Sequence, residues 1–103
     1  MSDDSLSFHT RRYFASSVGL ALPLKLISEI GPEAIQNRNT YFIGFFDDSG
    51  RLLGFDKMVY GERAAFHRYE YASEGVLKRA VLLPEGDDEE RALEFDESGR
   101  PLV

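Results

Sequence analysis

The chain has 103 residues, of which 43% are hydrophobic, and its 18 acidic and 12 basic residues give it a net charge of −6. It contains no cysteine, which excludes disulfides, thiolate metal sites and cysteine nucleophiles. The acidic balance argues against nucleic acid as a partner, because phosphate backbones are bound by clustered lysine and arginine. We therefore expect one domain over residues 1–103 with no nucleic-acid partner.

The N-terminal third has a weaker pattern than the rest of the chain. We expect residues 1–8 to be disordered and residues 13–20 to form a degenerate hairpin. The apolar segment Leu20–Ile27 is interrupted by Pro23, which removes a backbone donor. Residues 31–37 begin with Gly-Pro-Glu, which is typical of the first turn of a helix. We expect a short helix there.

The longest apolar stretch, residues 18–24, contains both Gly19 and Pro23. It is far shorter than the roughly 20 residues that a membrane helix needs. The start of the chain does not show the basic and apolar pattern of a signal peptide. We expect a cytoplasmic protein that does not contact a membrane.

Three similar phrases centre on Gly50, Gly75 and Gly99, and each has an aromatic residue four positions before its glycine. The first and third read Phe-Asp-x-Ser-Gly-Arg. An aspartate at this position accepts hydrogen bonds from the turn backbone, and glycine adopts the left-handed conformation with least strain. The phrases therefore predict hairpins with three-residue loops, each a type I turn followed by a glycine bulge.

The segments around these turns are rich in residues that favour β-strands. We expect strands over Thr40–Phe46, Leu52–Tyr60, Ala65–Tyr71, Val76–Leu83 and Ala92–Phe95. The turn register places Glu70 opposite Lys78 and Gly44 opposite Gly54. The predicted fold class is mainly β: an antiparallel meander of repeated hairpins, with a short N-terminal helix packed on one face.

The first hairpin is apolar on both faces. Because successive strand residues point to opposite sides, its second face consists of Tyr41, Ile43, Phe45, Leu53, Phe55 and Val59. An apolar face of this size needs a cover. Either the segment Leu20–Ile27 and the short helix cover it, or it is the contact surface for a protein partner or for a second copy of the chain.

No motif assigns catalysis, a metal or a cofactor. His9 and His67 are the only histidines and lack the spacing of a zinc site. Catalysis by His67, which we expect near Lys57 or Tyr60, would need a cleft and an orienting carboxylate. One cluster of polar residues forms either a structural network or a recognition surface. The second alternative is suggested by its Tyr and Arg residues, which are typical anchors of binding surfaces. It consists of Arg38, Asn39, Tyr41, Lys57, Tyr60, Glu62, His67 and Tyr69.

Two resemblances are carried by these residues. The Phe-Asp-x-Ser-Gly-Arg phrase resembles the hairpin unit of YD (Rhs-type) repeats over residues 40–103. The phrases LPLKL, NRNTYF, VYGE and HRYEY resemble a group of small bacterial proteins of unknown function over most of the chain. The first resemblance implies a β-hairpin architecture and the second a bacterial source. Neither implies an activity.

These features favour a non-enzymatic protein-binding module, such as an inhibitor or immunity-type partner of a bacterial effector. The acidity, the small size and the spare apolar face motivate this hypothesis. One alternative is a small enzyme or ligand-binding domain that uses His67, Tyr69 and Arg38. The other is a structural protein that self-associates through its edge strands.

Overall fold

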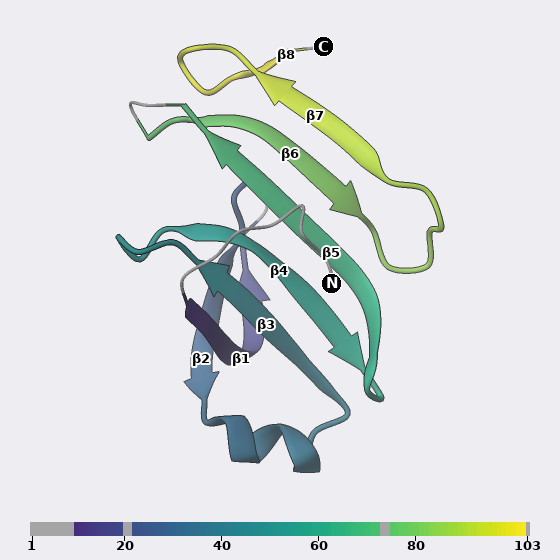
Figure 1. The fold of residues 1–103 in the computed structure, drawn as a ribbon. Coiled ribbons are helices and arrows are strands. Elements are labelled where there is room, and N and C mark those ends of the chain that lie inside the picture. Colours follow the sequence, from purple (N-terminus) through teal and green to yellow (C-terminus); the bar gives the residue numbers. More distant parts are fainter. Residues whose placement is uncertain (1–9, 20–21, 73–74, 103) are drawn as a thin grey trace.

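The computed structural model describes residues 10–19, 22–72 and 75–102, which build one eight-stranded antiparallel sheet (Figure 1). The elements are β1 (Thr10–Val18), β2 (Lys25–Ile30), the 3-10 helix η1 (Pro32–Asn37), β3 (Thr40–Phe46), β4 (Leu52–Val59), β5 (Glu62–Tyr71), β6 (Leu77–Leu83), β7 (Arg91–Phe95) and β8 (Pro101–Leu102). The strand order is β2-β1-β3-β4-β5-β6-β7-β8. From β3 onward each strand pairs with the next, which confirms the predicted mainly-β, antiparallel meander.

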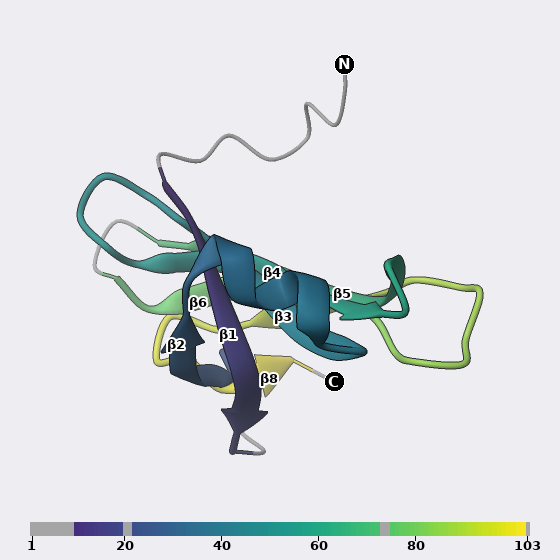
Figure 2. The same cartoon turned by 90° about the horizontal axis from the view of Figure 1, so that it is seen from below.

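The helix η1 makes the one connection that leaves the meander order. Because β1 lies between β2 and β3, the chain must pass β1 on its way from β2 to β3. Helix η1 makes this passage and contacts β1 (Figure 2). It has only six residues, and none of them is buried. The short helix predicted over residues 31–37 is thus present only as a six-residue 3-10 connection between two strands, and a helix packed on one face of the sheet is not supported.

The three glycine turns form as the sequence predicts. The Gly50 N–H donates to the Asp47 carbonyl at 3.0 Å, and the Asp47 N–H donates to the Arg51 carbonyl, also at 3.0 Å. The same pair of bonds links the corresponding residues at Gly75 and at Gly99. All three glycines have φ of 88° or 89°, the left-handed conformation that favours glycine. At Gly50 and Gly99 this pattern is that of a type I turn with a glycine bulge, whereas the two central residues of the Gly75 turn, 73 and 74, lie outside the described residues.

In two of the hairpins the strand register shifts shortly after the turn, which changes the predicted strand pairing. In the hairpin β5–β6 the register shifts between Glu70 and Tyr71, so that Glu70 pairs with Arg79 and not with Lys78. The corresponding shift in β3–β4 makes Gly44 the partner of Phe55 and Gly54 the partner of Phe45. The prediction that the two glycines oppose each other is therefore wrong. One extra residue on the second strand reverses which side chains share a face beyond it.

The main core lies on one side of the sheet, which we call the pocket face. Its buried side chains are Phe14, Phe42, Phe46, Phe55, Tyr69, Leu77 and Ala80. Leu22, Leu24 and Leu26 of the apolar N-terminal segment pack against this cluster. A Cβ atom on Gly44 would lie 2.7 Å from Cδ1 of Leu26, so the glycine makes room for this cover. The segment therefore covers the face opposite to the one predicted.

The opposite face carries Tyr41, Ile43, Phe45, Phe66 and Arg68. Tyr41 and Phe45 are only 9% and 7% exposed. Phe55, which we placed with them, belongs to the pocket face because of the register shift. Of the apolar face predicted to need a cover, Tyr41, Phe45 and Phe55 are therefore buried, whereas Ile43, Leu53 and Val59 are half-buried.

Residues 1–8, for which we predicted disorder, lie outside the described residues, as do Leu20 and Ala21. Within the described ranges no helix is long and apolar enough to cross a membrane. The cytoplasmic location stays a prediction.

Candidate functional site

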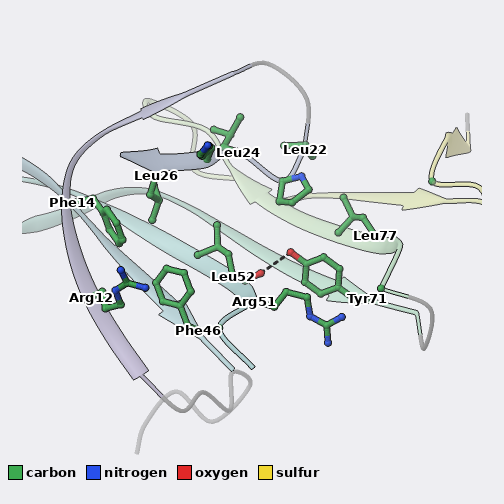
Figure 3. A pocket seen from close by; sticks show the side chains of 15 residues that line it. Arg12, Phe14, Leu22, Leu24, Leu26, Phe46, Arg51, Leu52, Tyr71 and Leu77 are labelled. Atoms are coloured by element: carbon green, nitrogen blue, oxygen red, sulfur yellow. Dashed lines mark hydrogen bonds between the residues drawn. The ribbon is translucent and has the colours of Figure 1, made fainter. Parts of the chain in front are cut away.

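A pocket of about 670 Å³ lies between the loop that precedes β2 and the pocket face of the sheet (Figure 3). This volume falls in the range of pockets that hold small organic molecules. The lining comes from β1, the loop, the ends of three hairpins and the strands next to them. It consists of Arg12, Phe14, Leu22, Pro23, Leu24, Lys25, Leu26, Phe46, Gly50, Arg51, Leu52, Tyr71, Gly75, Leu77 and Gly99.

The glycine turns shape one end of this pocket. Gly50, Gly75 and Gly99 all line it, because the meander brings its hairpin ends on one side of the sheet together. A Cβ atom on Gly50 would meet nothing within 4 Å, and one on Gly75 would meet only an Arg51 nitrogen at 3.9 Å. The turns at Gly50 and Gly75 thus leave open space beside the pocket, whereas a Cβ atom on Gly99 would lie 3.1 Å from Cγ1 of Val76.

The floor of the pocket is apolar and held in place. Phe14, Phe46 and Leu77 are buried core residues, and Leu52 and Tyr71 pack against them. The Tyr71 hydroxyl donates a hydrogen bond of 2.6 Å to the Leu52 carbonyl, which ties the ends of β5 and β4 together across the floor (Figure 3). A floor fixed in this way loses little entropy when a ligand binds.

The loop over the pocket is attached to the sheet by Tyr69. The Leu24 backbone N–H donates to the Tyr69 hydroxyl oxygen at 3.1 Å. This oxygen also lies 2.6 Å from Nδ1 of His67. The hydroxyl can accept from Leu24 and donate its own hydrogen to His67 Nδ1, an arrangement in which the histidine is neutral with its hydrogen on Nε2.

Burial explains the protonation of this pair. It lowers the pKa of His67 from 6.5 to about 4, with a further contribution from the charge of Arg68. Burial also raises the pKa of Tyr69 above its usual value. Both side chains are therefore neutral near pH 7. No hydrogen bond in the described residues joins a carboxylate to His67, so the pair acts as a structural link and lacks the orienting acid that a general base would need.

Positive charge surrounds the pocket in an otherwise acidic chain. Arg12, Lys25 and Arg51 line it, whereas none of the lining residues within the described ranges is acidic. Arg12 forms a two-pronged ion pair with Glu29, and Arg51 contacts Asp47 through Nε at 3.3 Å. In a chain with six more acidic than basic residues, this composition favours an anionic group on the ligand.

The predicted recognition surface is dispersed over the sheet. Arg38, Asn39, Tyr60 and Glu62 are exposed near the ends of β3, β4 and β5, and Tyr60 is 76% exposed. The Asn39 carbonyl accepts from the Tyr60 N–H at 2.7 Å, so the structure brings these two backbones together. Arg38 donates through Nε to the Thr40 carbonyl.

The remaining predicted site residues also have separate roles. Tyr41 is buried on the opposite face beside the Tyr13 ring. Lys57 pairs with Ala65 in the sheet, and its Nζ forms an ion pair of 2.6 Å with Glu85. His67 pairs with Phe55, whose ring centroid lies 4.5 Å from its own, and therefore lies away from Tyr60 at the strand end. Only His67 and Tyr69 form a common network.

Sequence reasoning missed the pocket and its cations. Arg12 was not singled out, and Arg51 was noted only as part of a turn. One signal was present: a proline inside an apolar segment predicts a loop, and an apolar loop must lie against an apolar surface. Which surface it meets depends on the long-range pairing of β1 with β3, which no local pattern encodes.

The described residues contain no group of three or more histidine, aspartate or glutamate side chains that could hold a metal ion.

Comparison with known proteins gives a family and no activity. No curated protein and no solved structure matches the chain. A model described as "Family of unknown function (DUF6156)" matches residues 7–103. This agrees with the predicted resemblance to proteins of unknown function, while the YD-type relationship and the bacterial source stay predictions. Since the match spans nearly the entire sequence, the chain belongs to DUF6156, a family of unknown function.

Proposed function

We propose that this protein is a non-enzymatic binding protein for a small, mostly apolar molecule that carries a negative charge. The observation that supports this proposal best is the pocket between the sheet and the loop over residues 22–24 that precedes β2. Its floor is apolar, its rim carries three basic residues, and no acidic residue is found in the part of its lining that the structure describes. An apolar pocket with a few convergent polar groups is the usual form of a small-molecule site.

The alternatives from the sequence receive less support. A protein-binding module, such as an inhibitor or immunity-type partner, relied on an exposed apolar face, but Tyr41, Phe45 and Phe55 are at most 9% exposed. Self-association through the β8 edge is disfavoured because β8 has only two residues and begins with Pro101, whereas the other edge strand, β2, has six residues and no proline. The bacterial source, the YD-type origin of the hairpins and the cytoplasmic location are hypotheses that this proposal does not need.

The proposal is tested with the neutral apolar dye N-phenyl-1-naphthylamine, which fluoresces when it enters an apolar site. We expect saturable binding to the wild-type chain. Leu52 is half-buried and points into the pocket (Figure 3), so Leu52→Trp fills the space and should lower dye affinity at least tenfold. The chain has no tryptophan, so the introduced ring also reports directly on the site.

The matched control is Leu83→Trp. Leu83 is also half-buried but pairs with Phe66 and does not line the pocket. We expect this variant to bind the dye within threefold of the wild type. Circular dichroism verifies that both variants keep the sheet. An absence of saturable dye binding to the wild type, or equal losses in the two variants, would refute the proposed function.

A further inference from the structure

The three basic residues at the pocket differ in what they already bind. Arg12 donates from Nε to Glu29 at 3.0 Å, and its Nη2 also pairs with Glu29. The hydrogen bond from Arg12 holds the pKa of Glu29 below its usual value, so this carboxylate is ionised at neutral pH. The charge of Arg12 is therefore already matched by one carboxylate. A ligand would have to compete with Glu29 for the guanidinium.

Arg51 is placed differently. Its side chain makes one hydrogen bond, of 3.3 Å, from Nε to Oδ2 of Asp47. The other oxygen of Asp47 already accepts from Ser49 N, Ser49 Oγ and Arg51 N at 2.8–2.9 Å. These contacts lower the pKa of Asp47 to about 2, so its carboxylate is ionised and accepts hydrogen bonds mainly from the turn. In the described part of the chain, neither Nη nitrogen of Arg51 takes part in a hydrogen bond.

The guanidinium of Arg51 is nevertheless held in position. Its central carbon lies 4.4 Å from the centroid of the Tyr71 ring, a typical cation–π distance. The hydrogen bond from Tyr71 to Leu52 fixes that ring in turn. An arginine stacked on an immobile ring, with both terminal nitrogens available, offers a planar fork that matches a carboxylate.

The pocket lets a ligand reach this fork with an apolar tail. Figure 3 shows Arg51 beside Tyr71 towards one end of the pocket and Phe14 and Leu26 towards the other. Leu52 lies between them. Lys25, which forms no ion pair in the described residues, adds positive charge at the start of β2 without the geometry of a fork.

From this geometry we infer that the ligand is a monocarboxylate with an apolar body, and that the Nη nitrogens of Arg51 bind its carboxylate while the body lies over Leu52 towards Phe14. The inference rests on the proposed function and adds the class of ligand and its orientation. Arg51 is the residue that selects the charged head group.

The test compares decanoate with the neutral decanol, both used below their aggregation concentrations, by displacement of N-phenyl-1-naphthylamine. We expect the wild-type chain to bind decanoate about tenfold more tightly than decanol. In Arg51→Gln the ratio of the two affinities should fall to about one. Arg51→Lys keeps the charge and loses the fork, and should give an intermediate ratio.

Arg79→Gln is the control for the loss of one positive charge elsewhere. Arg79 pairs with Glu70 on β5 and does not line the pocket, so this variant should keep the wild-type ratio. If Arg51→Gln keeps the tenfold preference, the assignment of Arg51 is wrong although the proposed function stands. If decanol and decanoate bind equally well to the wild type, both the assignment of Arg51 and the negative charge of the ligand are wrong, and only the binding of an apolar molecule stands. If neither compound displaces the dye, the proposed function itself fails.

Discussion

The two faces of the sheet each hold an arginine against aromatic rings, yet the two arginines are in different states. On the opposite face, Nη1 of Arg68 donates to the carbonyls of Phe55 and His67, and Nη2 pairs with Asp56 at 2.8 Å. Its side chain is only 17% exposed. On the pocket face, the side chain of Arg51 is 42% exposed and makes one long hydrogen bond.

This difference separates a structural cation from one that can bind a ligand. Both Nη nitrogens of Arg68 are hydrogen-bonded and its charge is matched within the sheet, and its central carbon lies 5.4 and 4.7 Å from the ring centroids of Phe45 and Phe66. Arg51 stacks on Tyr71 at a similar distance but keeps its terminal donors for solvent or a ligand. We therefore expect substitution of Arg68 to lower stability strongly, and substitution of Arg51 to weaken ligand binding strongly.

The largest expected effect concerns the glycine beneath Arg68. A Cβ atom on Gly54 would lie 2.4 Å from the His67 carbonyl oxygen and 3.1 Å from the Arg68 Cα. Both are backbone atoms, so Gly54→Ala must move β4 away from β5. We expect a loss of about 3 kcal/mol in the free energy of unfolding, measured by urea denaturation. The control is Gly50→Ala, which meets no atom within 4 Å and should cost only about 1 kcal/mol for its left-handed φ. Equal losses would contradict the close approach.

Arg68→Met comes next. Methionine keeps much of the apolar contact but leaves the carboxylate of Asp56, itself 16% exposed, without its partner. We expect a loss of about 2 kcal/mol in the free energy of unfolding. Arg79→Met removes an exposed arginine paired with Glu70 and should cost about 0.5 kcal/mol or less. If the two variants lose the same stability, Arg68 is not the structural arginine that its contacts indicate.

Much of the meander could be predicted from local chemistry. Asp47 and Asp96 accept hydrogen bonds from the turns that follow them, and Gly50 and Gly99 adopt the left-handed conformation, all as their sequence phrase predicts. Local signals of this kind identify turns because every atom involved lies within five residues.

The pocket could not be predicted in the same way. Arg51 sits beside Tyr71 only because β4 pairs with β5 in one register, and the register shift after Phe45 decides which face Phe55 joins. Leu26 reaches the pocket face because β1 inserts between β2 and β3. These are consequences of long-range pairing, and one extra residue in a strand reverses them.

The link between the loop and the sheet gives a pH dependence. The pKa of His67 is lowered to about 4 in the folded chain from 6.5 in the unfolded one. The unfolded chain therefore binds more protons between these values, so the contribution to stability is complete above pH 6.5 and declines as the pH falls towards 4. Because His67 is only half-buried, we expect about 1 kcal/mol of loss between pH 7 and pH 5.

The measurement is urea denaturation at several pH values, with His67→Gln as the reference. Glutamine can accept the hydrogen bond from Tyr69 but does not titrate. We expect the variant to show a smaller decline over the same interval. Parallel curves for the two proteins would mean that other groups cause the pH dependence and that His67 is protonated without cost.

The smallest expected effect on stability is that of Arg51→Gln, which sharpens the comparison with Arg68. The variant loses one long hydrogen bond and an exposed stacking contact. The three hydrogen bonds to Oδ1 of Asp47 come from Ser49 and from the backbone N–H of residue 51, so the variant keeps them. We expect the free energy of unfolding to change by less than about 0.5 kcal/mol. Decanoate should distinguish the two proteins. At ten times its dissociation constant for the wild type it stabilises the wild type by about 1.4 kcal/mol, and at that same concentration it should stabilise Arg51→Gln, which binds it about tenfold more weakly, by only about 0.4 kcal/mol. A loss without ligand as large as that of Arg68→Met would mean that both arginines are structural, and the pocket face would then have no cation reserved for a ligand.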